Sequence, residues 1–239
     1  MKNLFFFTVL AFCLVACTKF DFEEGIVVNN KELMSYLLRI YDTNKDGKLS
    51  KSEALKVTMI SIRTQDEIDG LENFPNLKDL SLYRCAITDI DLSKNIKLTH
   101  LSLMGDVMLK TLDLTNNAEL FLFYHSGGVM ESIYLGHKPK LIHFRCSENK
   151  LTALDLSGCE NLELVECYYN LLTEIDVSQC PHLLEFSCLE NQLKTLDVSN
   201  NTSLNWLSCR YNDMDTLFMK EGQKLQWLSK DDHTEIVYR

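Results

Sequence analysis

Apolar residues recur at a nearly constant interval along most of this 239-residue chain. A similar segment opens with leucine every 21 residues, with one step of 22, at Leu77, Leu98, Leu120, Leu141, Leu162, Leu183, Leu204 and Leu225. Within each copy, apolar and polar residues alternate over short runs, which is typical of half-buried strands. Self-similarity at one period predicts a solenoid in which each copy forms one turn.

Polar residues and prolines mark the turns between these strands. Three consecutive copies read LIHFRCSENKLTALDLSGCEN, LELVECYYNLLTEIDVSQCPH and LLEFSCLENQLKTLDVSNNTS. Each copy holds two apolar segments, and each segment is followed by Asn or a substitute. Pro75, Pro139 and Pro181 share one slot, two residues before the opening leucine. Proline cannot donate to a sheet ladder, so this slot is predicted to be a turn.

These segments resemble the leucine-rich repeats of the nested 21-residue bacterial class, which read LxxLxCxxNxLxxLDLxxN. The resemblance covers about residues 77–229. A degenerate copy precedes it, with Val57, Ile60 and Ile62 in the apolar slots. The resemblance implies a leucine-rich-repeat solenoid with parallel β strands on two faces and little helix, and a role in interaction rather than catalysis. The copy at 120–140 departs most, because His125 replaces Cys or Leu and Gly127–Gly128 lie near the Asn slot.

Seven cysteines lie within the repeats. Cys146, Cys167, Cys188 and Cys209 share one inward slot, about 4.8 Å apart per turn. Such a column spans roughly 14 Å, so four sulfurs cannot converge on one zinc ion with bonds of about 2.3 Å. Neighbours could approach disulfide distance, but parallel side chains give poor geometry. We therefore expect buried thiols that pack as small apolar groups, and the same for the two turn-slot cysteines, Cys159 and Cys180.

The stretch YDTNKDGKLSKSE, residues 41–53, resembles an EF-hand calcium loop. This resemblance implies a calcium site, in which calcium is the cofactor and Gly47 permits the sharp turn. Its ligands would be Asp42, Asn44, Asp46, the Lys48 carbonyl, Ser50 and a bidentate Glu53.

Calcium loops of this kind usually occur in pairs, and the chain holds no second one. The helix predicted before the loop, KELMSYLLRIY, carries Leu33, Leu37 and Ile40 on one stripe, and Lys51–Val57 forms a second short helix. We expect residues 31–62 to form an EF-hand-like helical cap on the solenoid rather than a sensor. The solenoid is predicted over 63–229, and residues 230–239 are predicted to form a C-terminal cap.

The N-terminus has the pattern of an export signal. Lys2 precedes an apolar run from Leu4 to Val15, which rises about 18 Å as a helix and is too short to cross a hydrocarbon core of about 30 Å. The following Leu-Val-Ala-Cys17 resembles a bacterial lipobox. It implies a signal peptide over 1–16, lipidation of Cys17 and an acidic tether over 17–30. We expect a lipid anchor in the bacterial cell envelope, at the outer membrane or cell surface; the alternative is a buried N-terminal helix.

The remaining composition argues against two classes of function. The formal net charge is −10, and no block of basic residues interrupts it, so nucleic acid is not an expected partner. No nucleophile motif or phosphate-binding glycine loop is present, so we expect no enzyme and no catalytic residues. Outward aspartates recur at Asp155, Asp176 and Asp197. Neighbours in this row would repel by only about 0.9 kcal/mol in a water-like dielectric, so the row needs no ion.

The two strand faces differ in their outward residues. The LDLS face repeats Asp, Thr, Ser and Lys, whereas the xCxxN face is rich in the rings and cations enriched in binding hot spots. We predict a ligand-binding face comprising Tyr83, Tyr124, His143, Arg145, Tyr168, Tyr169, Trp206, Arg210, Tyr211 and Trp227. Trp206 and Trp227 share one slot and should lie side by side.

This face favours a surface lipoprotein that binds a protein or a glycan. One alternative is an accessory or catalytic subunit of an envelope nutrient-processing system, with its chemistry in the irregular 120–140 copy. The other is that the rings are ordinary scattered surface aromatics.

Overall fold

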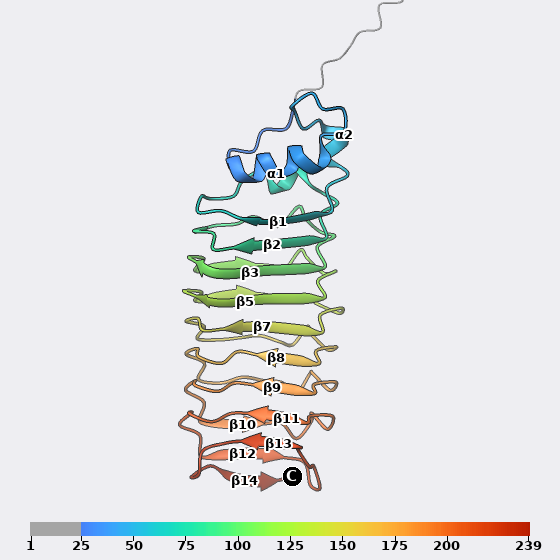
Figure 1. Cartoon of the computed structure of the whole chain (residues 1–239). Coiled ribbons are helices and arrows are strands. Elements are labelled where there is room, and N and C mark those ends of the chain that lie inside the picture. Colours follow the sequence, from blue (N-terminus) through green and yellow to red (C-terminus); the bar gives the residue numbers. More distant parts are fainter. Residues whose placement is uncertain (1–24) are drawn as a thin grey trace, which may run out of the picture.

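The computed structural model describes residues 25–239, so the predictions made for residues 1–24, including Cys17, lie outside the described residues. The chain winds into a solenoid whose front is one parallel sheet of nine strands (Figure 1). In spatial order these are β1 (Met59–Arg63), β2 (Asp79–Tyr83), β3 (His100–Val107), β5 (Leu122–Gly128), β7 (His143–Ser147), β8 (Leu164–Glu166), β9 (Glu185–Ser187), β11 (Trp206–Ser208) and β13 (Trp227–Ser229).

The opposite side of the solenoid holds two small parallel sheets. One pairs β4 (Thr111–Asp113) with β6 (Ser132–Tyr134); the other runs β10 (Thr195–Asp197), β12 (Thr216–Met219) and β14 (Glu235–Tyr238). The predicted solenoid of parallel strands on two faces is confirmed, but regular pairing is patchy on the LDLS side. On this side, turns lie close to both ends of each segment, so only three or four residues of a segment can pair with the next strand. The last strand, β14, lies within residues 230–239 and covers β12.

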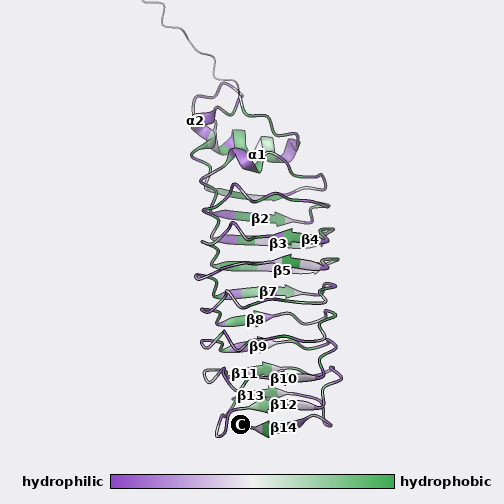
Figure 2. Ribbon diagram, turned by 180° about the vertical axis from the view of Figure 1, so that it is seen from behind, coloured by the Kyte–Doolittle hydropathy of each residue, from purple (hydrophilic) through white to green (hydrophobic). Residues whose placement is uncertain are grey.

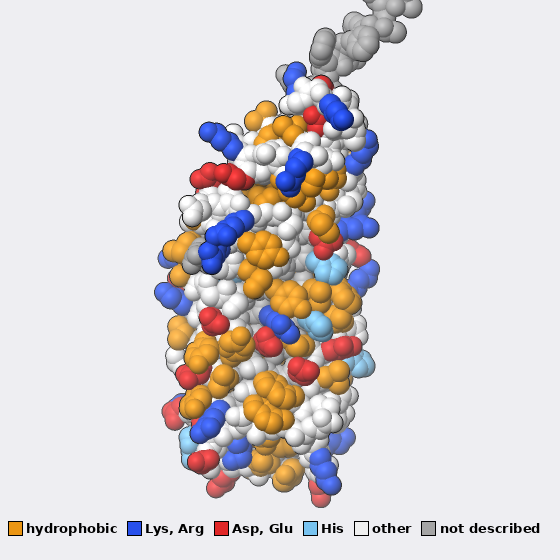
Figure 3. Space-filling view, viewed as in Figure 1, with side chains coloured by type: hydrophobic (Ala, Val, Ile, Leu, Met, Phe, Trp, Pro, Cys, Tyr) orange, Lys and Arg blue, Asp and Glu red, His pale blue; other side chains and the backbone are white. Residues whose placement is uncertain are grey.

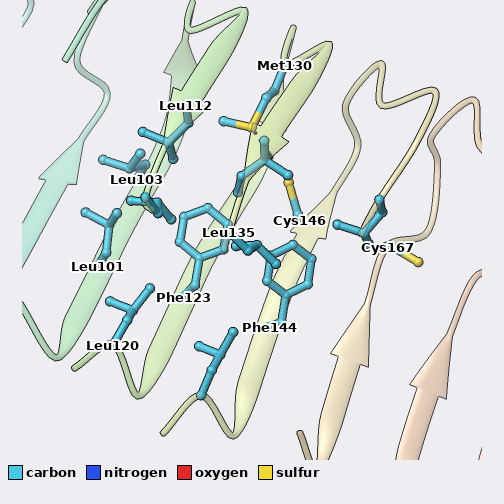
Figure 4. Close-up of a cluster of buried hydrophobic side chains, with 14 of the residues drawn as sticks. Leu101, Leu103, Leu112, Leu120, Phe123, Met130, Leu135, Phe144, Cys146 and Cys167 are labelled. Carbon is cyan, nitrogen blue, oxygen red and sulfur yellow. Dashed lines mark hydrogen bonds between the residues drawn. The ribbon is translucent and has the colours of Figure 1, made fainter. Parts of the chain in front are cut away.

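One continuous core fills the space between the two sides, from Val28 to Met219. The opening leucines and the alternate strand residues point inward, and polar residues alternate with them along the strands (Figure 2). Phe123 and Phe144 occupy one slot in consecutive turns and stack with ring centroids 5.4 Å apart (Figure 4). The repeat period is therefore the period of core packing.

Buried asparagine side chains tie consecutive turns together. The Asn191 amide Nδ2 donates to the carbonyls of Cys167 (3.0 Å) and Cys188 (3.1 Å), and its Oδ1 accepts from the N–H of Leu172 (3.0 Å). Asn170 and Asn212 make the same contacts one turn before and after. These bonds satisfy turn groups that no strand ladder reaches.

The cysteines behave as the sequence predicts. All seven among the described residues are buried and free of disulfides. Burial raises the pKa of Cys167 and Cys209 to about 12, and raises the pKa of Cys188 well above its ordinary value. These thiols stay protonated at neutral pH and pack as small apolar groups.

Two helices cover the β1 end of the solenoid (Figure 1). Asn30 is the N-cap of helix α1 (Lys31–Tyr41), and its side chain accepts from the Leu33 N–H. Ser50 is the N-cap of the short α2 (Lys51–Ala54) and forms a capping box with Glu53. Leu33 and Leu37 are fully buried in the same core as the repeats. A single 3₁₀ turn, Leu71–Asn73, lies between β1 and β2.

We predict that Asn191→Ala lowers the free energy of unfolding by about 2–4 kcal/mol. The change leaves the Leu172 N–H without its acceptor and removes one of two asparagine donors from each of the Cys167 and Cys188 carbonyls. Denaturant unfolding followed by circular dichroism measures this loss. Asn205→Ala is the control, since Asn205 is an exposed asparagine in the next copy. Equal stability of the two variants would contradict a structural role for the asparagine contacts.

Candidate functional site

The outward side chains of the front sheet stand in rows, because each parallel strand is in register with the next at an interval of one repeat. Trp206 pairs with Trp227 in this register, and His143 pairs with Leu164. The indole rings of Trp206 and Trp227 stack with centroids 4.5 Å apart and planes 9° apart. Trp227 is 43% exposed, and Trp206 is half-buried. The predicted side-by-side tryptophans are therefore present as a stacked pair.

A second group crosses three strands in the middle of the same sheet. The Arg145 guanidinium lies 5.1 Å from the ring centroid of Tyr124, and its Nε is 3.1 Å from the Glu166 carboxylate. The Tyr124 hydroxyl and the His143 Nδ1 are 3.5 Å apart. Arg145 is thus already held by a ring and a carboxylate, and a ligand would meet an organised polar group here.

The remaining predicted residues lie where the strands end. The rings of Tyr168 and Tyr169 meet edge to face at 5.8 Å, and the Arg210 guanidinium lies 5.0 Å from the centroid of Tyr211. Tyr83 is 41% exposed on β2, near the other end of the sheet. The structure thus gathers nine of the ten predicted residues into four local groups and leaves Tyr83 apart.

The repeat pattern did not predict the backbone conformation at this turn. Tyr169 and Tyr211 have φ values of 53° and 57°, in the left-handed region that side chains disfavour. The same slot holds Arg84, Gly105, Gly127, Glu148 and Glu190, all with positive φ. Gly105 and Gly127, which occupy this slot in two copies, were the sequence signal for a positive φ at this turn. This turn projects large side chains from the edge of the face at about one repeat interval.

Hydrophobic side chains form separate patches along this side of the molecule, with charged groups between them (Figure 3). Apolar and charged side chains therefore lie close together along this side of the solenoid. Such a mixture is typical of interfaces with apolar anchors and polar surroundings.

The calcium-loop residues form a compact turn between α1 and α2. Asp42 Oδ2 accepts from the Gly47 N–H (3.0 Å), and Asp46 Oδ1 accepts from the Lys48 N–H (2.8 Å). Gly47 has a φ of 77°, as the sharp turn at this position requires. Within residues 25–239, no three His, Cys, Asp or Glu side chains are gathered as a group that could hold a metal ion.

Glu53 is the buried carboxylate of this loop, with 3% of its surface exposed. Its Oε1 accepts from the Thr43 N–H (2.7 Å), and its Oε2 accepts from the Ser50 N–H (3.0 Å). Burial by itself would raise the pKa of Glu53, but the hydrogen bonds from Ser50 and Thr43 outweigh it and hold the pKa at about 2. The loop therefore keeps an ionised carboxylate across its closing end, and its all-oxygen donor set has the chemistry that calcium prefers.

The irregular 120–140 copy has a structural explanation. His125 takes the inward slot that Cys146 holds in the next strand. Its Nδ1 lies 2.9 Å from the Leu103 carbonyl oxygen, and its Nε2 lies 3.0 Å from Asn149 Oδ1. A side chain at Gly128 would place Cβ 2.8 Å from both the His125 ring and Asn149, so only glycine fits. In this structure His125 is buried and engaged at both nitrogens rather than open to solvent.

The aspartate row on the LDLS side shapes the turns. Oδ1 of each aspartate accepts from the N–H two residues later, at Ser93, Thr115, Ser157, Ser178 and Ser199. The bonds from Ser93, Thr115 and Ser157 hold the pKa of Asp91, Asp113 and Asp155 below its ordinary value. These carboxylates cap the backbone of the turns, a role that the outward row of aspartates in the sequence did not predict.

Lys138 was also not anticipated as a buried charge. It is fully buried in the turn slot that Asn117 occupies one copy earlier, and its Nζ donates to the Leu135 carbonyl. Burial lowers the pKa of Lys138. The position therefore supports the turn rather than a surface site.

Comparison with known proteins identifies the fold. The leucine-rich-repeat domain of APL1B is similar, with a TM-score of 0.62 and 21% identity over 78% of this chain and 57% of that chain. A leucine-rich-repeat protein of Leptospira interrogans gives a TM-score of 0.61 and 21% identity over 79% and 58%, respectively. This chain has a leucine-rich-repeat fold. It spans somewhat more than half the length of these two structures.

A third similar structure comes from the octameric complex of Latrophilin 3, Unc5D and the leucine-rich-repeat protein FLRT2. It gives a TM-score of 0.52 and 18% identity over 70% of this chain and 68% of that chain. No protein-family model matches the chain, and no curated protein matches its sequence. Neither α1 nor α2 has the length and apolar character needed to span a membrane.

We predict that the stability of the protein falls as the pH drops below about 6.5. Burial lowers the pKa of His125 from its ordinary 6.5, although its two acceptors favour the charged ring. The unfolded chain then takes up a proton that the folded chain does not, so the free energy of unfolding should fall by up to roughly 1 kcal/mol per pH unit from this group. Denaturant unfolding between pH 7 and pH 5 measures the slope.

The slope should be reduced in His125→Leu, because leucine stands in this slot in β3 at Leu103. His182→Gln removes an exposed histidine and serves as the control. If wild type and His125→Leu have the same slope, His125 does not carry the pH dependence.

Proposed function

We propose that this chain is a protein-binding leucine-rich-repeat module, and that its ligand face is the outward side of the front sheet around Trp206 and Trp227. The stacked tryptophan pair carries this proposal. Exposed indole is costly in water, and tryptophan, tyrosine and arginine are the residues most enriched in binding hot spots. Stacking leaves the pair as one rigid apolar unit, so little side-chain entropy is lost on binding.

The surroundings of the pair support a protein partner. Charged and polar side chains lie along the same face, including the Arg145–Glu166 pair and Arg210, whose Nε is 3.9 Å from Asp231. An apolar anchor with a polar rim is the arrangement found in protein interfaces. A similar fold in a complex with Latrophilin 3 and Unc5D supports the same proposal by analogy of fold only.

We further propose that the module acts at the bacterial cell envelope, held by lipid on Cys17. The apolar run ending in Leu-Val-Ala-Cys supports this anchor. The Ile26 N–H donates to the Leu49 carbonyl at 2.7 Å and Val28 is buried in the common core, so the fold begins before Lys31. Residues 18–25 therefore separate Cys17 from the folded cap, and the tether is shorter than the 17–30 segment expected from the sequence. A tether of this length would lift the solenoid from the membrane and leave its front face open to a partner.

The calcium loop is proposed to stabilise the cap. Calcium would neutralise the carboxylates of Asp42, Asp46 and Glu53, which lie at the junction between α1 and α2. Leu49, inside the loop, is fully buried in the common core, so an ordered loop anchors the cap to the first turns.

We expect calcium to stabilise the soluble mature chain, meaning residues 17–239 with Cys17→Ser. With calcium near 1 mM and a dissociation constant near 10 μM, binding would add roughly 2.7 kcal/mol to the free energy of unfolding. Thermal melts with calcium chloride and with chelator should therefore differ by several degrees.

The two melts should coincide for Asp42→Ala, which removes the first ligand. Asp66→Asn removes an exposed carboxylate outside the loop and should keep the calcium response. Coinciding wild-type melts at saturating calcium would rule out a stabilising calcium site.

The ligand face is tested on an identified partner. The soluble mature chain is screened against purified envelope and host proteins and against a glycan array, and affinities are then measured by calorimetry. Trp206→Ala/Trp227→Ala should weaken binding at least about thirtyfold, since an aromatic anchor contributes about 2 kcal/mol or more.

The matched control is Tyr134→Ala/Tyr238→Ala, which removes two exposed rings from the back strands β6 and β14. It should change the affinity less than twofold. A larger loss in this control than in the tryptophan variant would move the site to the back. Glycans as the only ligands would overturn the proposal of a protein partner.

A further inference from the structure

A groove of about 470 Å³ lies between helix α1 and strand β1, at the opposite end of the front sheet from the tryptophan pair. One polar face of α1 forms one wall, because Lys31, Ser35 and Arg39 recur at intervals of four residues. The outward residues of β1, Ser61 and Arg63, belong to the other wall. The opposite face of α1 is buried in the core, so the orientation of this polar face is fixed.

Tyrosine side chains set how the helix lies on the strand. The hydroxyls of Tyr36 and Tyr41 both donate to the Met59 carbonyl, at 3.3 Å and 3.1 Å. The end of α1 therefore lies beside the start of β1, and Lys31 lies toward Arg63. The Arg39 guanidinium lies 5.8 Å from the Tyr36 ring centroid. Positive groups thus stand toward both ends of the groove, with two serine hydroxyls between them.

These cations have no acidic partners in the described part of the chain. Of its six arginines, Arg145, Arg210 and Arg239 pair with a carboxylate within 4.0 Å. Arg39 and Arg63, which both line the groove, have no carboxylate within this distance among the described side chains.

Acidic groups do not cancel this charge locally. The one carboxylate in the groove wall, Glu32, accepts from the Thr64 hydroxyl at 3.4 Å and pairs with no cation in the described residues. Residues 31–84 hold nine basic and nine acidic side chains, a net charge of 9 − 9 = 0, whereas the whole chain carries −10. The groove walls themselves hold Lys31, Arg39 and Arg63 against Glu32 alone, so the groove is a positive site in a neutral segment of an acidic protein.

We propose that this groove binds an acidic peptide segment. Guanidinium groups bind carboxylates with two parallel hydrogen bonds, and an extended peptide with repeated acidic side chains can reach cations at both ends. The serine and tyrosine hydroxyls offer further donors and acceptors along the groove. Seven strand spacings of about 4.8 Å, roughly 34 Å, separate β1 from β11. The site is thus distinct from the tryptophan pair, and its test does not depend on the proposed ligand face.

Fluorescein-labelled hexaglutamate is the probe, and its anisotropy is measured with the soluble mature chain at low ionic strength. We expect saturable binding that weakens as salt is added, and no binding of hexaglutamine. Arg39→Gln/Arg63→Gln should weaken binding about tenfold, as expected for the loss of two exposed ion pairs. Ser61→Glu, which places a carboxylate in the groove, should weaken it as well.

The matched control is Lys94→Gln/Lys224→Gln, which removes two exposed positive charges outside the groove. Its affinity should stay within twofold of wild type. An equal loss in the control, or unchanged affinity in both groove variants, would overturn the proposal. Tighter binding of a sulfated oligosaccharide than of hexaglutamate, lost on Arg39→Gln/Arg63→Gln, would overturn the peptide in favour of a polysulfate ligand.

Discussion

Hydrogen bonds from buried asparagine side chains hold each turn of this solenoid to the next. At a turn the backbone leaves the strand ladder, and its inward carbonyls would otherwise be buried without a donor. The Asn191 amide donates to carbonyls in two consecutive copies and accepts an N–H from the earlier one. Because this contact joins equivalent points of adjacent copies, and Asn170 and Asn212 repeat it, it holds the one-repeat register of β7, β8, β9 and β11.

The register in turn determines the surface. Equivalent outward positions on neighbouring parallel strands are forced to within about 4.8 Å along the solenoid. Large rings in one slot must then stack, as Trp206 and Trp227 do, and opposite charges in one slot pair, as Arg145 and Glu166 do. The face is therefore a set of rows whose chemistry changes from copy to copy. Because the outward residue in a given slot differs from copy to copy, the face offers different contacts at different positions along the solenoid.

The supply of hydrogen-bond donors inside the fold decides which buried polar groups keep a charge. Glu53 stays ionised because the Ser50 and Thr43 groups donate to it. The column thiols have few donors and stay protonated. Groups inside the solenoid thus serve its packing, and the groups free to meet a partner are at the front face and at the junction with the cap.

The sequence alone determined the repeat, its 21-residue period, the inward slots and the turn asparagines, because each copy must bury the same positions against its neighbours. It also determined which residues face outward, since side chains alternate along a strand. Only the tertiary structure decided the left-handed turn that projects Tyr169 and Tyr211, the burial of Lys138, and the pairing of His125 with Asn149. Each of these depends on contacts between copies, which a local pattern does not encode. The groove of Arg39 and Arg63 likewise exists only because α1 folds back along β1, placing residues 24 positions apart in sequence (63 − 39 = 24) in the walls of one groove.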